Sequence, residues 1–183
     1  MPNETALVVL VPEAESLVGS FRTRYDRSAA SGVPAHVTAL YPFLAPERLT
    51  AQELASLRAF LADLPGFTVT FSKFGRFSEV LYLAPEPAAP LRRLTEVLLV
   101  RYPQLQPYGG AFDEIIPHLT VAHLDGPLDL DAVEAEIAAP AGRLLPIRTA
   151  VRAVSLLAED DGRWVLREQF PLAAEQTRGF ERP

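Results

Sequence analysis

The sequence contains no cysteine, and its basic residues do not outnumber the acidic ones. The first absence excludes a disulfide framework, a thiol nucleophile and a thiolate metal site, so the fold must be stabilised by its core. The second leaves a formal net charge of −6, which argues against a broad basic surface for duplex DNA or long RNA. A short nucleotide bound in a local pocket is still compatible with this charge.

Long apolar runs are absent too. The first apolar run, ALVVLV at residues 6–11, follows no basic leader and is too short for a signal or transmembrane helix. We therefore expect a cytoplasmic protein that does not bind a membrane. We also expect it to act as a monomer.

The overall composition is that of a folded protein, because 49% of the 183 residues are hydrophobic. A chain of this length suits one sizeable core rather than several independent domains. We expect a single two-lobed domain over residues 1–172. Residues 173–183 lack apolar periodicity and are expected to fray.

The pattern His-x-Thr occurs twice, in a chain with three histidines. His36 and Thr38 form the first pair, and His118 and Thr120 the second. Residues two apart on a β-strand project from the same face. A lone histidine is more often a partly buried core residue, but two matched pairs indicate two strands that present imidazole and hydroxyl groups to one groove. Such a groove would handle phosphate.

The order of predicted elements repeats around these pairs. The first half predicts, in order, a strand at 6–11, a helix at 13–26, a strand at 35–41, a helix beginning at the capping box Thr50–Glu53, and a strand from 67. The second half predicts a strand at 80–83, a helix ending before Pro103, a strand at 115–124, a helix from Asp129 to near Pro140, and strands at 147–157 and 163–170. A turn near Gly75 and the hairpin turn Asp160-Asp161-Gly162 complete the pattern.

This repeat predicts an α+β fold with two lobes. We expect duplicated antiparallel sheets related by a pseudo-two-fold axis, with helices outside and a central groove between the two His-x-Thr strands. Leu119 and Val121 should face the core and so hold His118 and Thr120 toward the groove.

The two pairs suit the hydrolysis of a phosphodiester or cyclic phosphate. That reaction needs a base to activate water, an acid to protonate the leaving oxygen, and donors to hold the phosphoryl oxygens. Two imidazoles in opposite protonation states can supply the first two roles. We assign His36 and His118 as the acid/base pair and Thr38 and Thr120 as phosphate-holding donors.

With these motifs the chain resembles the two-histidine phosphoesterase superfamily, in particular its bacterial 2′-5′ RNA ligase-like and cyclic phosphodiesterase branch. The sequences HVTALYPF at 36–43 and PHLTVA at 117–122 carry the likeness, which spans about Leu7 to Phe170. The resemblance implies a bilobal fold with a central groove. It also implies metal-independent action on 2′,3′-cyclic phosphate ends of RNA or on small cyclic nucleotides, without a cofactor.

One position departs from that family pattern. Five residues after the second motif histidine, many relatives carry arginine, whereas this chain has His123. By strand alternation His123 should point to the face opposite His118, outside the catalytic set. The alternative that the three histidines bind a metal meets the same objection, and no Asp or Glu lies at ligand spacing from His36.

Further residues could contact a substrate. Phe77 and Tyr108 fall in predicted loops and are the preferred candidates for stacking on a base. Arg148 and Arg152 share one face of the predicted strand at 147–157 and could add positive charge to the groove, although a solvated face explains them equally well.

The leading hypothesis is therefore a cyclic phosphodiesterase acting on a nucleotide or RNA terminus. Reversible 2′-5′ RNA ligation is the same chemistry with a hydroxyl in place of water. A nucleotide-binding module without turnover is the alternative from another class, although pure binding does not require two titrating groups.

Overall fold

The computed structural model describes residues 4–111, 115–124 and 129–175. Within them the chain forms two four-stranded antiparallel sheets, with strand orders β2-β1-β7-β8 and β5-β4-β3-β6. The strands are β1 (Thr5–Leu10), β2 (His36–Leu40), β3 (Phe67–Arg76), β4 (Val80–Glu86), β5 (Leu119–His123), β6 (Ile147–Val151), β7 (Ala153–Asp160) and β8 (Arg163–Pro171). The predicted α+β class with two antiparallel sheets is thus confirmed.

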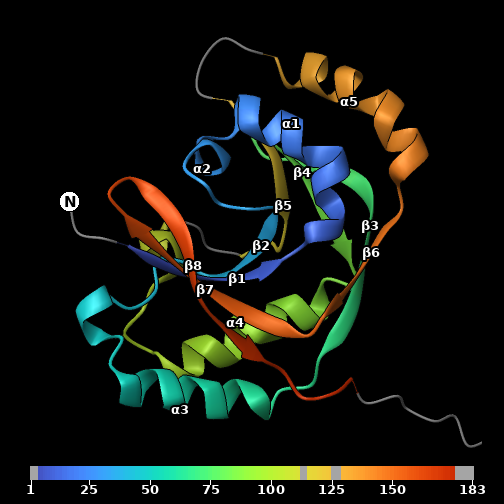
Figure 1. The fold of residues 1–183 in the computed structure, drawn as a ribbon. Helices are drawn as coiled ribbons and strands as arrows, with labels where there is room; N and C mark the ends of the chain where they lie inside the picture. The colour runs from blue at the N-terminus through green and yellow to red at the C-terminus, as the bar shows by residue number, and fades with distance from the viewer. Residues whose placement is uncertain (1–3, 112–114, 125–128, 176–183) are drawn as a thin grey trace, which may run out of the picture.

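The helices lie outside the sheets (Figure 1). They are α1 (Glu15–Tyr25), α2 (Arg27–Ala30), α3 (Ala51–Ala62), α4 (Ala89–Arg101) and α5 (Leu130–Leu144), with 3-10 turns η1 (Pro12–Ala14), η2 (Pro46–Arg48) and η3 (Pro107–Gly110). Two of the expected helix N-caps are present. The Glu53 backbone N–H donates to Thr50 Oγ1 at 3.2 Å and that of Asp131 to Asp129 Oδ1 at 2.9 Å.

The two halves of the sequence do not each form a sheet of their own. In the first sheet β1 lies between β2 and β7, and in the second sheet β4 lies between β5 and β3. Strand β3 of the first half has therefore joined the sheet of β4 and β5, and β7 and β8 of the second half have joined the sheet of β1 and β2, whereas β6 stays in the sheet of its own half. The helices cross as well, because α1 packs on β5 and α4 packs on β2. Equivalent strands nevertheless occupy equivalent positions, as the repeat predicts.

The first sheet is curled. The backbone N–H of Trp164, at the start of the edge strand β8, donates to the Ser31 carbonyl at 2.7 Å. This bond joins β8 to the segment that leads into β2, at the opposite edge of the same sheet. In Figure 1 the β7–β8 hairpin arches toward α2 accordingly.

One hydrophobic core joins both sheets. It contains the inward residues of β1 and β5 together with the buried faces of α1 and α4, including Leu7, Leu17, Leu98 and Leu119. A smaller cluster of Ala6, Val8, Val33 and Leu157 fills the curled side of the first sheet. Among the described residues, no helix is long and apolar enough to cross a membrane.

Several predicted boundaries were wrong. The segment 147–157 is two strands, β6 and β7, which belong to different sheets. Strand β3 continues through Gly75 instead of turning there. Helix α5 continues through Pro140 to Leu144, because buried Ile137 and Ala141 lie on either side of the proline and keep that stretch packed. Between the predicted helix at 13–26 and the predicted strand at 35–41 lies the short helix α2, which was not predicted from the sequence.

The C-terminal segment is held further than expected. The backbone N–H of Ala173 donates to the Leu64 carbonyl, and the Ala173 carbonyl accepts from Gly66, each at 2.8 Å. The Thr68 hydroxyl also donates to Glu175 Oε2 at 3.1 Å. The expectation of fraying from residue 173 is therefore wrong at its start, and residues 176–183 lie outside the described part of the chain.

Candidate active site

The two motif imidazoles are fixed by the same hydrogen bond. Nδ1 of His36 lies 2.8 Å from the carbonyl oxygen of Pro34, and Nδ1 of His118 lies 2.7 Å from that of Ile116. A carbonyl oxygen can only accept, so Nδ1 carries the hydrogen in both rings. In each ring Nε2 is left as the atom that takes up or releases a proton.

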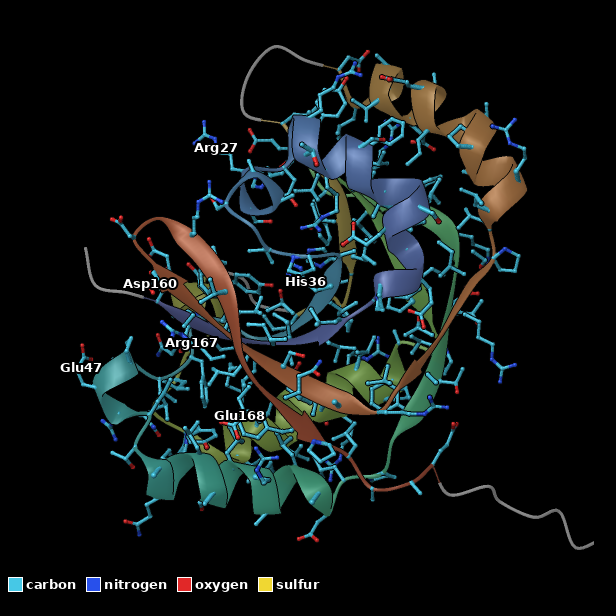
Figure 2. All side chains as sticks on the ribbon, viewed as in Figure 1. Arg27, His36, Glu47, Asp160, Arg167 and Glu168 are labelled. Carbon is cyan, nitrogen blue, oxygen red and sulfur yellow. The ribbon has the colours of Figure 1, made fainter. Side chains whose placement is uncertain are left out.

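Strand alternation turns both pairs away from the core. In β2, Val37 and Ala39 are buried while His36 and Thr38 keep partial exposure. In β5, Leu119 and Val121 expose no surface, which confirms their predicted role as anchors. In Figure 2, His36 lies near the centre of the molecule, where β2 passes between the β7–β8 hairpin and α1.

The two histidine strands meet. β2 and β5 are edge strands of different sheets and contact each other. His118 is close enough to His36 for its charge to lower the pKa of His36. The structure therefore brings together the two predicted pairs, which the sequence places in different halves of the chain.

Both imidazoles titrate below their ordinary range. Burial is the largest cause for His36, whose pKa falls to about 4, and the Pro34 carbonyl opposes this shift. Among charged neighbours, Arg22 lowers this pKa and Asp26 raises it. Burial likewise lowers the pKa of His118, against the effect of the Ile116 carbonyl. Both rings are consequently neutral at pH 7.

The position of His123 contradicts its prediction. Tyr82 pairs with Thr120 but Leu81 pairs with Ala122, so β5 contains an extra residue at Val121. Val80, two residues from Tyr82, pairs with His123. Directly opposed residues of an antiparallel pair share a face, so exposed His123 lies on the same face as Thr120. The bulge reverses the alternation on which the prediction depended.

The location of His123 on the same face as Thr120 does not by itself create a metal site. Within the described part of the chain, no three His, Asp or Glu side chains come together in an arrangement that could hold a metal ion.

Aromatic rings flank the second pair. The Phe77 ring meets that of His118 edge-on, with centroids 5.0 Å apart, and Tyr82 lies 5.4 Å from the same imidazole. Phe77 and Tyr82 pack on each other at 4.6 Å. Phe77, predicted from the sequence, is thus beside the site. Tyr82 was missed, although its place between the buried Leu81 and Leu83 could have signalled an outward-facing ring.

A second aromatic group flanks Thr38. Burial raises the pKa of Tyr108, and a hydrogen bond between its hydroxyl and the Thr38 side chain lowers it. Tyr108 lies edge-on to Tyr41, and Tyr41 to Trp164, with centroids 6.1 Å apart in both pairs. Tyr108 was predicted as a stacking residue and is beside the site. Trp164 was missed, because no local pattern connects it to residues so far away in the sequence.

The two predicted arginines lie further away. Arg148 is on β6, at the opposite edge of the second sheet from β5. Three strand spacings separate these edges, about 14 Å. Arg152 falls between β6 and β7. Their contact with substrate stays a prediction, and it would need a substrate that extends across the sheet.

Taken together, the arrangement has the groups that acid/base catalysis on a phosphate needs. Two imidazole rings, each in a fixed tautomer, can accept or donate a proton at Nε2. Two threonine hydroxyls lie on the same strand faces as the rings. Partial burial makes hydrogen bonds to a charged phosphoryl group stronger than they would be in water.

Known proteins have sequences similar to that of this chain. The family model described as the 2′-5′ RNA ligase superfamily matches residues 10–163. A protein named "Putative phosphoesterase GK0864" from Geobacillus kaustophilus (strain HTA426) is 27% identical over 183 residues, covering 93% of this chain and 97% of that protein. A protein named "Putative phosphoesterase" from Bacillus pumilus (strain SAFR-032) is 28% identical, covering 92% and 97%.

Solved structures share the fold. E. coli LigT complexed with 3′-AMP matches with a TM-score of 0.57 at 18% identity, covering 94% of this chain and 99% of that one. The protein TT0787 of Thermus thermophilus matches with a TM-score of 0.57 at 19% identity, covering 94% and 100%. With the family match over most of its length and a matched pair of His-x-Thr strands, the chain belongs to the 2′-5′ RNA ligase superfamily, the two-histidine phosphoesterases.

Proposed function

We propose that this phosphoesterase is a metal-independent cyclic phosphodiesterase, which hydrolyses the 2′,3′-cyclic phosphate of a nucleotide or RNA end. The observation that carries the proposal is the matched pair of Nδ1–carbonyl hydrogen bonds at His36 and His118. They leave two Nε2 atoms, on strands in contact, to act on one phosphate.

The reaction uses the two rings in opposite states. One neutral Nε2 takes a proton from water as the water oxygen bonds to phosphorus. The other ring, protonated, donates its Nε2 proton to the ribose oxygen as the P–O bond of the cyclic ester breaks. The Thr38 and Thr120 hydroxyls donate to phosphoryl oxygens and stabilise the charge that develops there. Exchange with solvent then restores both rings.

Two further observations support a nucleotide substrate. Aromatic rings lie beside both pairs, where a base could stack: Phe77 near His118 and Tyr108 near Thr38. LigT, which shares the fold, has been solved in complexes with 3′-AMP, ATP and NADP+. Both motifs come from one chain, which is consistent with a monomer, whereas the cytoplasmic location stays a prediction.

The test is hydrolysis of 2′,3′-cyclic mononucleotides by the purified protein in the presence of a chelator. Turnover is expected in the wild type, and His36→Ala and His118→Ala should each lower kcat by about 10²- to 10⁴-fold, the usual contribution of a general acid or base. Circular dichroism should show that both variants are folded. Undiminished turnover in either folded variant would sink the assignment.

The same preparation separates the alternatives. Incubation with a cleaved RNA that has a 2′,3′-cyclic phosphate and a free 5′-hydroxyl end distinguishes ligation from hydrolysis by the product formed. Tight nucleotide binding with no product at high enzyme concentration would instead favour a binding module.

A further inference from the structure

Helix α1 holds the three residues that precede His36. Arg22 Nη1 donates to the Val33 carbonyl at 3.1 Å. Two residues later, the backbone N–H of Ala35 donates to Glu15 Oε1 at 2.6 Å. Between these two contacts stands Pro34, whose carbonyl oxygen accepts the hydrogen bond from His36 Nδ1.

The two helical residues are placed to act together. Glu15 and Arg22 are seven residues apart, which is two turns, so they share one face of α1. Each fixes the backbone on one side of Pro34, and a peptide carbonyl held on both sides cannot rotate freely. The direction of the acceptor that orients the imidazole is therefore set by α1.

Arg22 is itself immobilised. Its side chain is 2% exposed and donates from Nε and Nη2 to Asp26 Oδ2, at 3.2 and 3.0 Å. Asp26 is 6% exposed and also accepts from the Ser28 backbone and hydroxyl, at 3.0 and 2.7 Å. Taking two charges out of water is costly, and a buried ion pair is weak evidence for stability. In this chain the pair fixes the guanidinium that donates to the Val33 carbonyl.

The second motif is held differently. His118 Nδ1 has the equivalent carbonyl, that of Ile116. Among the side-chain hydrogen bonds of the described residues, however, none reaches the backbone of residues 115–117 from another element. The α1 contacts are thus particular to His36.

We propose that Glu15 and Arg22 are positioning residues for His36, which hold the Pro34 carbonyl against Nδ1 and so keep Nε2 as the proton-transferring atom. The effect on turnover rests on the proposed function. The effect on the ring does not, because the tautomer of His36 is a property of the unliganded protein.

Electrostatics agree with this geometry. Arg22 and Asp26 affect the pKa of His36 in opposite directions, so the buried pair lies close to the imidazole. A ring displaced by about 1 Å from its productive position can lose roughly 10²-fold in rate, even when the changed residue never touches the substrate.

The experiment compares two Glu15 variants. Glu15→Leu removes the acceptor for the Ala35 N–H, whereas Glu15→Gln keeps an oxygen there. The readout is the ¹⁵N NMR spectrum of the His36 ring, assigned by its loss in His36→Ala. Wild type and Glu15→Gln should show the Nδ1–H tautomer, and Glu15→Leu a mixture of both tautomers.

Kinetics give a second readout. Glu15→Leu should lower kcat by about tenfold or more with KM changed by less than about twofold, because ground-state binding groups are untouched. The matched control is Glu13→Leu, two residues before Glu15. The Glu13 carboxylate accepts a hydrogen bond from the Thr149 hydroxyl at 3.0 Å and none from the described residues that precede His36. This control should leave the ring tautomer and kcat unchanged.

An unchanged His36 tautomer in the folded Glu15→Leu variant would overturn the proposal, whatever its activity. Equal loss in Glu13→Leu would overturn it as well. If Glu15→Leu does not fold, Glu15→Asp takes its place, since it keeps the charge but is one methylene too short. Should the wild type fail to hydrolyse cyclic phosphates, the proposed function falls while the NMR comparison still decides the role of Glu15.

Discussion

At the scale of single residues, the candidate site contains two imidazoles that have the same tautomer but different surroundings. Both bond a carbonyl through Nδ1, but the buried Arg22–Asp26 pair lies near His36. The two pairs could be predicted because alternation on a short strand is a local property. The face on which His123 lies could not be predicted, since the bulge at Val121 depends on how β5 pairs with β4.

The lowered pKa values predict an acidic optimum for kcat/KM. One ring must be neutral and the other protonated in the free enzyme, and the pKa of each lies below the ordinary value of 6.5. The optimum of kcat/KM should therefore lie below pH 6.5, with a decline as pH rises toward 8. Initial rates at low substrate between pH 4.5 and 8.5 measure this. A rate constant that stays level up to pH 8 would contradict it.

Stability must be followed in the same series. Between pH 6.5 and about 4 the unfolded chain binds a proton on His36 that the folded chain does not. The free energy of unfolding therefore falls as pH falls through this window, and it is regained as pH rises. Thermal melts at each pH show whether a loss of activity comes from unfolding of the protein or from a change in the protonation of the two histidines.

At the scale of elements, the hairpin turn predicted at residues 160–162 is present, whereas the turn predicted near Gly75 is not. The Asp160-Asp161-Gly162 turn joins β7 and β8 with positive φ at Asp161 and Gly162, as expected. The break between β6 and β7 was not visible, because apolar residues continue on both sides of Arg152 while the strands enter different sheets. Local composition indicates that a strand is buried, but it does not indicate which strand lies next to it in the sheet.

The β3–β4 pair predicts an unusual role for a glycine. Gly75 is directly opposite Tyr82, and a Cβ at Gly75 would overlap the Tyr82 ring. Gly75→Ala should push this ring away from His118 and lower kcat/KM roughly two- to tenfold, the value of about 0.5–1.5 kcal/mol for an aromatic contact. Because the ring end can move, the melting temperature should change little.

A double-mutant cycle checks the cause. In a Tyr82→Ala background, Gly75→Ala should have no further effect on kcat/KM, since the ring that it displaces is gone. An additive loss in the double variant would show that Gly75 acts on the site in some other way.

At the scale of the whole molecule, the exchange of strands and helices between the halves is the dominant feature. β1 needs β7 as its neighbour, and β4 needs β3. The repeat predicted like elements in like places, but it carried no information on which copy would fill each place.

Neither half should therefore fold alone. A fragment of residues 1–78 would contain β1 and β2 without β7, and β3 without any partner strand. We expect this fragment and residues 79–183 each to lack a cooperative thermal transition by circular dichroism. A sharp, reversible melt of either fragment would contradict the exchanged arrangement. The intact chain is the control.

The crossing of β7 has a consequence for synthesis. About 120 residues separate His36 from the start of β7, so at roughly 5–20 residues per second the first histidine strand waits about 6 to 24 s for its sheet to be completed. During that interval the apolar strand β1 has one unpaired edge. The nascent chain therefore exposes this edge, and the first sheet can be completed only after β7 has been synthesised.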